Sequence, residues 1–217
     1  IVAWLEADLA DGAGGVADRR TGEERAHDEL TALTTRQRRK VVVSAHSLGA
    51  VLAVSTIFTL GADTVDGLKN VGLLTYGTQL RAYFGRFFPE LFGPSALGTL
   101  PSRAPSLWKA DPWLRQVVED HAAEGSGGRD RDPDTGLRDR PTLRELLTQP
   151  DGQIAWVNLW RRTDYLGFPD ASFKDNEIDR GADEFGPPLY LVKVATHPGY
   201  QASSQYMVAL RDLMRRL

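Results

Sequence analysis

The stretch KVVVSAHSLGA, Lys40–Ala50, decides the fold. Its first part, Lys40–Ala45, is a continuous run rich in β-branched residues, which is typical of a strand buried on both faces of a parallel sheet. A helix predicted over Ser47–Leu60 follows at once and is apolar on nearly every side. A buried strand that turns directly into a buried helix indicates layered α/β architecture.

The same unit recurs along the chain. Further strands are predicted over Val71–Thr78, Ile154–Arg161 and Leu189–Ala195, with helical material between them, and an amphipathic helix over Gln201–Leu217 closes the chain. Strands that alternate with helices favour a parallel sheet with right-handed crossovers. We therefore predict an α/β protein with a mostly parallel sheet of about four strands and flanking helices.

The segment before Lys40 has a different pattern. Residues 1–10 carry apolar side chains at helical spacing, which predicts the end of an amphipathic helix. A Gly-rich, charged loop is predicted over residues 11–24, and a polar helix with a thin apolar stripe over Glu23–Gln37. No strand is predicted in this region.

Composition excludes several classes of function. The chain of 217 residues is long enough for one domain, and its 26 basic and 29 acidic residues give a net charge of −3. That balance does not favour nucleic acid or an anionic membrane surface as a partner. The absence of cysteine excludes disulfides, thiol nucleophiles and Cys-ligated zinc. No apolar run has the length of a membrane-spanning helix, and the composition leaves localisation and membrane association open.

A long insertion, residues 80–150, separates the second and third predicted strands. Its first part is rich in aromatic residues, and its second part, residues 121–140, is rich in Gly, Asp and Arg and predicts a mobile loop. Aromatic residues at helical spacing are most often core residues. The aromatic residues of the first part are Tyr83, Phe84, Phe87, Phe88, Phe92, Trp108 and Trp113.

Ser47 stands where the buried strand turns into the helix. A serine at such a turn exposes its Oγ above the carboxyl edge of the sheet. The turn brings together the residues two before and two after the serine, and these are small, Ala45 and Gly49. The helix N-terminus offers partial positive charge and the N–H of Leu48 to an oxyanion. The pattern predicts a nucleophile, and the alternative is a small-residue turn with a capping serine.

With His46–Gly49 intact, the chain resembles the lipase-like branch of the α/β-hydrolases, whose elbow commonly has the sequence Gly-His-Ser-Leu-Gly; here Ala45 replaces the first glycine. The resemblance covers residues 40–57, 71–80, 154–169 and 189–201. It implies a partial α/β-hydrolase fold, in one domain over residues 1–217. It also implies a serine nucleophile assisted by a carboxylate and a histidine that follow it in that order.

His197 is the predicted base. It follows the last predicted strand directly, in the segment ATHPGY. The other three histidines are less suitable, because His27 lies on a polar helix face, His46 adjoins the nucleophile and His121 lies on the polar loop. The alternative for His197 is an exposed loop histidine without a catalytic role.

Asp164 is the predicted acid. It follows the third predicted strand in NLWRRTDYLGFP, and similar lipase-like sequences carry a strand, an Asp and then a Pro, as Asn158, Asp164 and Pro169 do here. The alternative is a surface aspartate in an ion pair with the two arginines before it. Asp179 is the next candidate, and Asp170 is a further rival on the same loop.

The resemblance also implies substrate-binding positions. The segment Tyr76–Gln79 is similar to one that borders the nucleophile in lipase-like relatives, so Thr78 and Gln79, with His46, are predicted to bind substrate. The alternative is an ordinary turn. The segment Leu80–Val117 occupies the place of a cap or lid in many such enzymes, and its alternative is core.

These residues predict ester hydrolysis through an acyl-enzyme on Ser47, with a small-molecule or lipid ester as substrate and no metal or organic cofactor. One alternative is an acyltransferase with the same three residues. A second is a non-catalytic binding module on a hydrolase fold. A nucleotide-binding sheet is disfavoured, because SAHSLGA lacks a Gly-rich phosphate loop.

The resemblance further implies that the N-terminal half of a hydrolase domain is missing before Lys40. That half would supply several strands and the second oxyanion N–H, whose loss costs about 10²–10³ in turnover. We therefore expect the N-terminal portion of the same protein to be a partner, and this chain alone to be nearly inactive. We also expect one edge of the Lys40–Ala45 strand to be unpaired.

Overall fold

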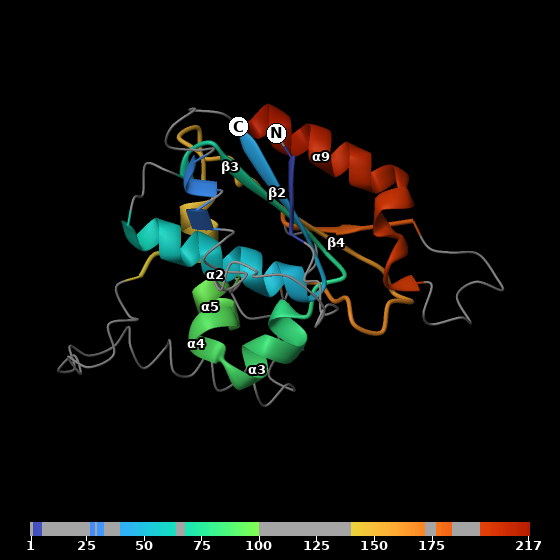
Figure 1. Ribbon diagram of the computed structural model, residues 1–217. Helices are drawn as coiled ribbons and strands as arrows, with labels where there is room; N and C mark the ends of the chain where they lie inside the picture. Colours follow the sequence, from blue (N-terminus) through green and yellow to red (C-terminus); the bar gives the residue numbers. More distant parts are fainter. Residues whose placement is uncertain are drawn as a thin grey trace, which may run out of the picture.

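The computed structural model describes residues 2–5, 27–28, 30–32, 40–63, 68–99, 140–171, 177–183 and 196–217 (Figure 1). Its strands form one sheet in which all neighbours are parallel and the spatial order follows the sequence. The α/β prediction is confirmed, with five strands in the described part of the chain instead of about four. The strands are β1 (Val2–Leu5), β2 (Val41–His46), β3 (Val71–Tyr76), β4 (Trp156–Trp160) and β5 (Asp179–Gly181).

β2 leads into Ser47, and β3, the central strand of the sheet, lies beside it. β2 and β3 pair in register from Val41 opposite Val71 to His46 opposite Tyr76, and every residue of β3 is buried. Their runs of β-branched and apolar residues suit strands that are covered on both faces. The carboxyl ends of β2 and β3 therefore lie side by side, which brings Ser47 next to the turn after Tyr76.

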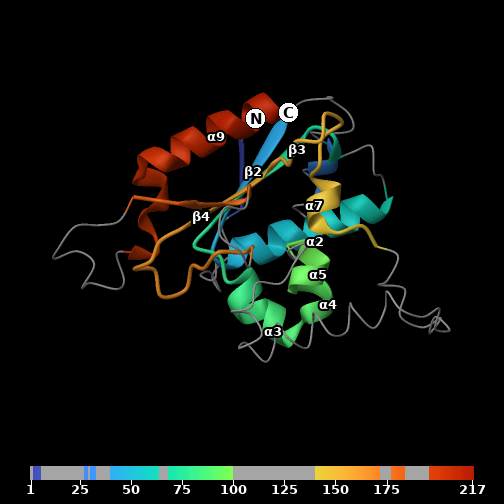
Figure 2. The same cartoon turned by 180° about the vertical axis from the view of Figure 1, so that it is seen from behind.

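Helices cover both faces of the sheet, as Figures 1 and 2 show from opposite sides. On one face α2 (Leu48–Asp63) packs on β2, and α7 (Leu143–Leu146) packs on α2; on the other face α9 (Ser204–Arg216) lies across β2, β3 and β4. Strands that follow the sequence order with right-handed crossovers place their connections on one face. The helix after the last strand is then left to cover the other face.

Successive side chains of β2 point to opposite faces of the sheet and so belong to two different apolar clusters. Val41, Val43 and Ala45 belong to the apolar cluster under α2, whereas Val42 belongs to the cluster under α9. On the α9 side the strand also presents Ser44, whose hydroxyl lies 2.8 Å from that of Tyr206. The period of two places the side chain of His46 on the α9 side as well.

The described part of the insertion packs beside α2. Leu80, Phe92 and Leu97 are buried in the same core as α2, whereas Tyr83 and Phe87 are exposed. The core interpretation thus holds for some of the aromatic residues, and the lid interpretation stays a prediction. Trp108, Trp113 and the polar loop of residues 121–140 lie, except for Arg140, outside the described residues. The helices here are η3 (Leu80–Phe84), α3 (Gly85–Phe87), α4 (Pro89–Phe92) and α5 (Pro94–Leu97).

The helix predicted over residues 1–10 is wrong for its described part. Val2–Leu5 form β1, which pairs in parallel with β2 from Val2 opposite Val42 to Leu5 opposite Ala45. A short apolar segment fits a helix or a strand equally well by periodicity, and pairing with β2 decides for the strand. The expectation of an unpaired β2 edge is therefore also wrong, while the missing N-terminal half stays a prediction.

β5 was not predicted, because its three residues Asp179–Gly181 are polar and form no apolar run. The strand predicted over Leu189–Ala195 lies outside the described residues. The helix predicted over Glu23–Gln37 is helical at residues 27–28 and 30–32, and its remainder is also outside them.

No helix among the described residues combines the length and the hydropathy that a membrane span requires.

Candidate active site

Ser47 occupies a strained turn at the carboxyl end of β2. Its φ is +52°, and it is the one non-glycine residue with positive φ in the described part of the chain. Positive φ is disfavoured for residues with a Cβ and often marks a functional site. Two backbone bonds hold the turn, because the N–H of Ser47 donates to Tyr76 O at 3.1 Å and the N–H of Ala50 donates to Ser47 O at 3.1 Å.

The helix that follows supplies the predicted oxyanion donor. α2 begins at Leu48, directly after the turn. The first N–H groups of a helix have no carbonyl one turn earlier to bond, and they carry the positive end of the helix dipole. The N–H of Leu48 therefore has the local setting that the prediction requires.

His197 and Asp164 lie in contact, although 33 positions separate them in the sequence. The Nδ1 atom of His197 lies 3.0 Å from Asp164 Oδ1 and 3.1 Å from Oδ2. The carboxylate side chain is completely buried and the imidazole is 13% exposed. An ionised carboxylate can only accept, so Nδ1 carries the proton and a neutral ring offers Nε2 as an acceptor. This is the tautomer that a general base needs.

Three donors converge on the Asp164 carboxylate. Besides His197, the N–H of Leu166 donates to Oδ1 at 2.9 Å and the hydroxyl of Tyr200 donates to Oδ2 at 2.7 Å. Burial by itself would raise the pKa of Asp164, but the hydrogen bonds from His197, Leu166 and Tyr200 outweigh it and hold that pKa below its ordinary value. Asp164 is therefore ionised at neutral pH.

The rival Asp179 has a different place. Its Oδ1 accepts from Asn158 Nδ2 at 2.7 Å and from the N–H of Asp170 at 2.8 Å, and its Oδ2 accepts from the N–H of Ala171 at 2.8 Å. These bonds tie the loop after β4 to β5, while His197 pairs with Asp164. The geometry separates the two candidates that the sequence left open.

Asp170, the other rival, is buried close to Asp179. Neither of its carboxyl oxygens has a hydrogen-bond partner among the described residues. Burial and the neighbouring Asp179 charge raise the pKa of Asp170 well above its ordinary value. Because its neutral form is favoured, this carboxyl group is unsuited to stabilise an imidazolium.

Ser47 and His197 meet the same short segment of chain. The N–H of Ser47 bonds to Tyr76, and an added Cβ on the next residue, Gly77, would lie 3.1 Å from His197 Cε1. Both side chains belong to the described part of the chain, and no hydrogen bond joins Ser47 Oγ to His197 Nε2 in it. The structure thus brings the serine and the histidine to one edge of the sheet without closing the last link.

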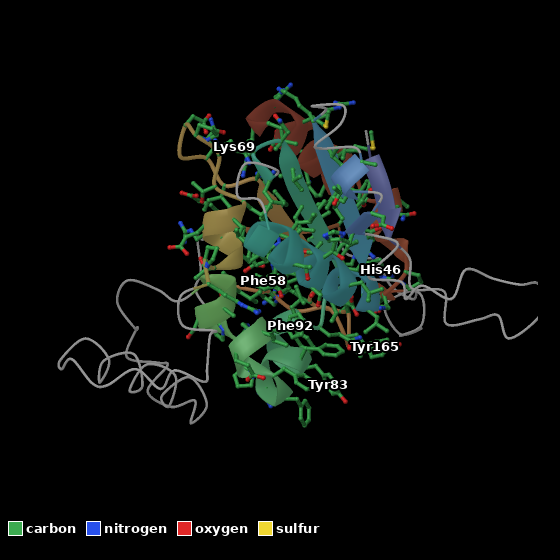
Figure 3. The ribbon with its side chains drawn as sticks, turned by 60° about the vertical axis from the view of Figure 1, so that its left-hand side comes forward. His46, Phe58, Lys69, Tyr83, Phe92 and Tyr165 are labelled. Atoms are coloured by element: carbon green, nitrogen blue, oxygen red, sulfur yellow. The ribbon has the colours of Figure 1, made fainter. Side chains whose placement is uncertain are left out.

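His46 precedes Ser47 in the chain, and its side chain contacts His197. Its Nε2 is 3.0 Å from His197 O, and its ring lies 4.6 Å from the His197 ring and stacks on Tyr76 at 5.1 Å. A carbonyl can only accept, so this contact requires the proton on His46 Nε2. Figure 3 shows His46 and Tyr165 at one end of the sheet, far from Lys69 at the other. His46 therefore supports the His197 backbone, and its contact with a substrate stays a prediction.

Thr78 and Gln79 form the start of the insertion. Thr78 is buried, its Oγ1 accepts from the N–H of Leu80 at 2.9 Å, and its carbonyl accepts from the N–H of Phe168 at 3.1 Å. The carbonyl of Gln79 accepts from the N–H groups of Tyr83 and Phe84. Both residues thus shape the rim of the site, and binding of substrate by them remains a prediction.

Sequence reasoning missed several residues that the structure places at the site. Tyr200 donates to Asp164, and Arg161 donates to the loop that carries His197. Gly77 and Gly167 have no side chain where the turn after β3 and the loop after β4 approach each other. An added Cβ on Gly167 would lie 2.6 Å from the Cα of Gly77. The sequence signal for the glycines is their position, Gly77 at the end of a predicted strand and Gly167 three residues after Asp164. No local signal marks Tyr200 or Arg161.

Gly77→Ala tests this packing. Gly77 has φ +57°, and an alanine Cβ would lie 3.1 Å from His197 Cε1 and 3.2 Å from Nδ1, so His197 must move. We expect any turnover that depends on the Asp164–His197 pair to fall at least about 100-fold, because small displacements of a reacting group have effects of that size. The matched control is Gly152→Ala, which has φ +82° with open space around it and should lose stability only. Equal activity losses in both variants would contradict the assignment.

Exposed aromatic side chains lie on the insertion and on the loop after β4. Tyr83 and Phe87 from the insertion are 56% and 66% exposed, and their rings lie 5.2 Å apart. From the loop after β4, Tyr165 is 49% exposed and its ring lies 6.0 Å from that of His197. Apolar surface therefore adjoins the site (Figure 3).

Fold and site together define an α/β protein with an all-parallel sheet, a strained serine after the second strand and a buried Asp–His pair beside it. A comparison with protein-family models, with curated proteins and with solved structures finds no match. Among the described residues, no group of three or more His, Asp or Glu side chains is placed to hold a metal ion.

Proposed function

We propose that this chain is a serine hydrolase that cleaves carboxylic esters through an acyl-enzyme on Ser47. The observation that carries the proposal is the 3.0 Å contact between His197 Nδ1 and Asp164 Oδ1, at the sheet edge where Ser47 adopts a φ of +52°. A buried Asp–His pair beside a strained serine is the arrangement that nucleophilic acyl transfer requires.

In the first step, Ser47 Oγ attacks the ester carbonyl carbon and its proton passes to His197 Nε2. Asp164 accepts the Nδ1–H bond and stabilises the imidazolium that forms. The negative charge moves to the former carbonyl oxygen, next to the N–H of Leu48. The proposal requires the serine hydroxyl to turn toward Nε2 when substrate binds, since such bonds often tighten only in the complex.

In the second step, His197 Nε2 donates the proton to the leaving alcohol as the bond from the carbonyl carbon to the alkoxy oxygen breaks. Water then attacks the acyl-enzyme, with Nε2 again as the base, and releases the carboxylic acid. The exposed rings of Tyr83, Phe87 and Tyr165 favour a substrate with an apolar acyl part.

The test is a rapid-mixing assay of the chain with p-nitrophenyl butyrate. A burst of p-nitrophenol equal to the protein concentration, followed by slower turnover to butyric acid, is expected for an acyl-enzyme. Repeating the assay with a primary alcohol measures transfer to an acceptor; butyric acid as the main product supports a hydrolase, and the butyrate ester as the main product supports an acyltransferase. Release is followed over hours as well as milliseconds, because slow turnover by this chain alone still gives a Ser47-dependent signal. No Ser47-dependent release of p-nitrophenol on either timescale would contradict both.

A further inference from the structure

The loop that carries His197 is held by side chains from β2 and from the end of β4, the two strands that flank β3. The carbonyl of His197 accepts from His46 of β2. The carbonyls of Thr196 and Gly199, on either side of it, accept from Arg161 at the end of β4, at 3.0 Å and 2.8 Å. Three carbonyls around the histidine are thus bound by side chains.

Arg161 is a buried cation in the middle of this arrangement. Its exposed fraction is 2%, and its Nε donates to a third carbonyl, that of Asp183, at 2.8 Å. An arginine that is removed from water costs more than an apolar side chain of the same volume, and such groups are retained where they specify one geometry. The guanidinium fork fits several carbonyls at fixed angles, which a lysine cannot do.

Tyr200 links this cation to the acid. The guanidinium carbon of Arg161 lies 4.3 Å from the centre of the Tyr200 ring, over its face. The tyrosine is completely buried, and its hydroxyl donates to Asp164 Oδ2 at 2.7 Å. The stacked cation fixes the plane of the ring, and the ring in turn fixes the direction of the O–H bond.

We propose that Arg161 and Tyr200 are positioning residues that jointly fix the Asp164–His197 pair, Arg161 through the backbone of the histidine loop and Tyr200 through the carboxylate. This inference rests on the proposed function, because a positioning role needs a reacting pair to position. Neither residue touches the reacting atoms. Their removal should therefore change turnover and the pH profile, and leave KM for a small ester nearly unchanged.

Tyr200→Phe is the decisive variant. It removes one donor from Asp164, so the carboxylate attracts the Nδ1–H of His197 more strongly and stabilises the imidazolium more. We expect kcat to fall about 10-fold or more through lost orientation. We also expect the acid limb of the pH–rate profile for p-nitrophenyl butyrate to move to higher pH by roughly half a unit. Arg161→Lys should lower kcat in the same way, because an ammonium cannot span the three carbonyls.

The matched control is Tyr206→Phe. Tyr206 is buried like Tyr200 and its hydroxyl also has one buried side-chain oxygen partner, Ser44 Oγ at 2.8 Å. It lies on α9 and is not among the hydrogen-bond partners of Asp164 in the described part of the chain. A merely structural role for Tyr200 predicts that both variants lose stability and share the wild-type pH profile.

A second measurement does not depend on turnover. The Nδ1–H proton of His197 should give a far-downfield proton NMR resonance that is absent in His197→Asn. We expect this resonance to shift or broaden in Tyr200→Phe and to stay in place in Tyr206→Phe. A resonance that is missing in the wild type, or unchanged in Tyr200→Phe, would overturn the inference. A wild type that shows the expected resonances and hydrolyses no ester would instead refute the proposed function alone.

Discussion

Ser47→Ala is expected to remove nearly all ester hydrolysis by the chain, leaving only the residual rate that binding and the oxyanion donor give without a nucleophile. Removal of the nucleophile from a Ser–His–Asp hydrolase costs up to about 10⁶ in kcat, so the loss is limited only by the activity that the wild type shows. The fold should persist, because Ser47 Oγ makes no hydrogen bond in the described part of the chain. The change to alanine breaks no hydrogen bond of the side chain and keeps the strained φ at position 47. The melting temperature should therefore stay nearly unchanged.

The control for this variant is Ser55→Ala. Ser55 lies on α2, the helix that follows Ser47, and its side chain is partly exposed. Alanine suits a helix interior better than serine does, so the control should be at least as stable as the wild type and fully active. The measurement is initial rate with p-nitrophenyl butyrate together with a thermal melt. Retention of more than a small fraction of turnover in Ser47→Ala would refute the nucleophile.

Asp164→Asn is expected to lower kcat by about 10⁴, the size of this effect in a Ser–His–Asp site. The reason lies in the donors around the carboxylate. Leu166 N–H points at Oδ1 and the Tyr200 hydroxyl at Oδ2, so an amide NH₂ at either position places a donor against a donor. The amide also favours the wrong tautomer of His197, with the proton on Nε2.

The stability of the same variant should depend on pH with a defined sign. The pKa of Asp164 in the folded chain is below its ordinary value of 3.8, so the ionised group stabilises the fold above that value. This contribution is lost as pH falls through the folded-state pKa. The free energy of unfolding of Asp164→Asn should therefore lie furthest below that of the wild type at neutral pH, and the gap should narrow in acid.

Asp179→Asn separates the two aspartates that the sequence could not distinguish. Asp179 accepts three hydrogen bonds that join the loop after β4 to β5, so the variant should lose stability. Its kcat should stay within about 10-fold of the wild type, because His197 pairs with Asp164. A larger loss of kcat in Asp179→Asn than in Asp164→Asn would reverse the assignment.

The elbow and the central strands could be predicted because local and global preferences agree there. The run Lys40–Ala45 suits only a buried strand, and the small residues around Ser47 suit only a tight turn into a helix. The candidates His197 and Asp164 followed from their order along the chain. Their contact is tertiary, and no local pattern distinguishes Asp164 from Asp179.

The errors have physical causes as well. Val2–Leu5 is too short and too uniformly apolar for its periodicity to separate helix from strand, and only pairing with β2 decides it. β5 is a polar segment held as a strand by its register with β4, from Asn158 opposite Asp179 to Trp160 opposite Gly181. Tertiary context overrides strand propensity in both segments.

Arg161 and Tyr200 show the limit of sequence reasoning at the site itself. An arginine at the end of an apolar strand, as Arg161 is, is usually solvated. A tyrosine three residues after a histidine, as Tyr200 is, has no role that the sequence alone indicates. Their function depends on which carbonyls and which carboxylate the folded loops bring within reach. That information is carried by the arrangement of β2, β4 and the histidine loop in space.

Covalent labelling with a fluorophosphonate, read by mass spectrometry of the intact chain and of its peptides, tests directly whether Ser47 is a nucleophile. Attack by the Ser47 oxygen on phosphorus displaces fluoride, so we expect one phosphonyl group per chain, on Ser47. Labelling should be lost in Ser47→Ala and slowed strongly in His197→Ala. A wild-type chain that stays unlabelled, or equal labelling of Ser47→Ala, would show that Ser47 is not a nucleophile.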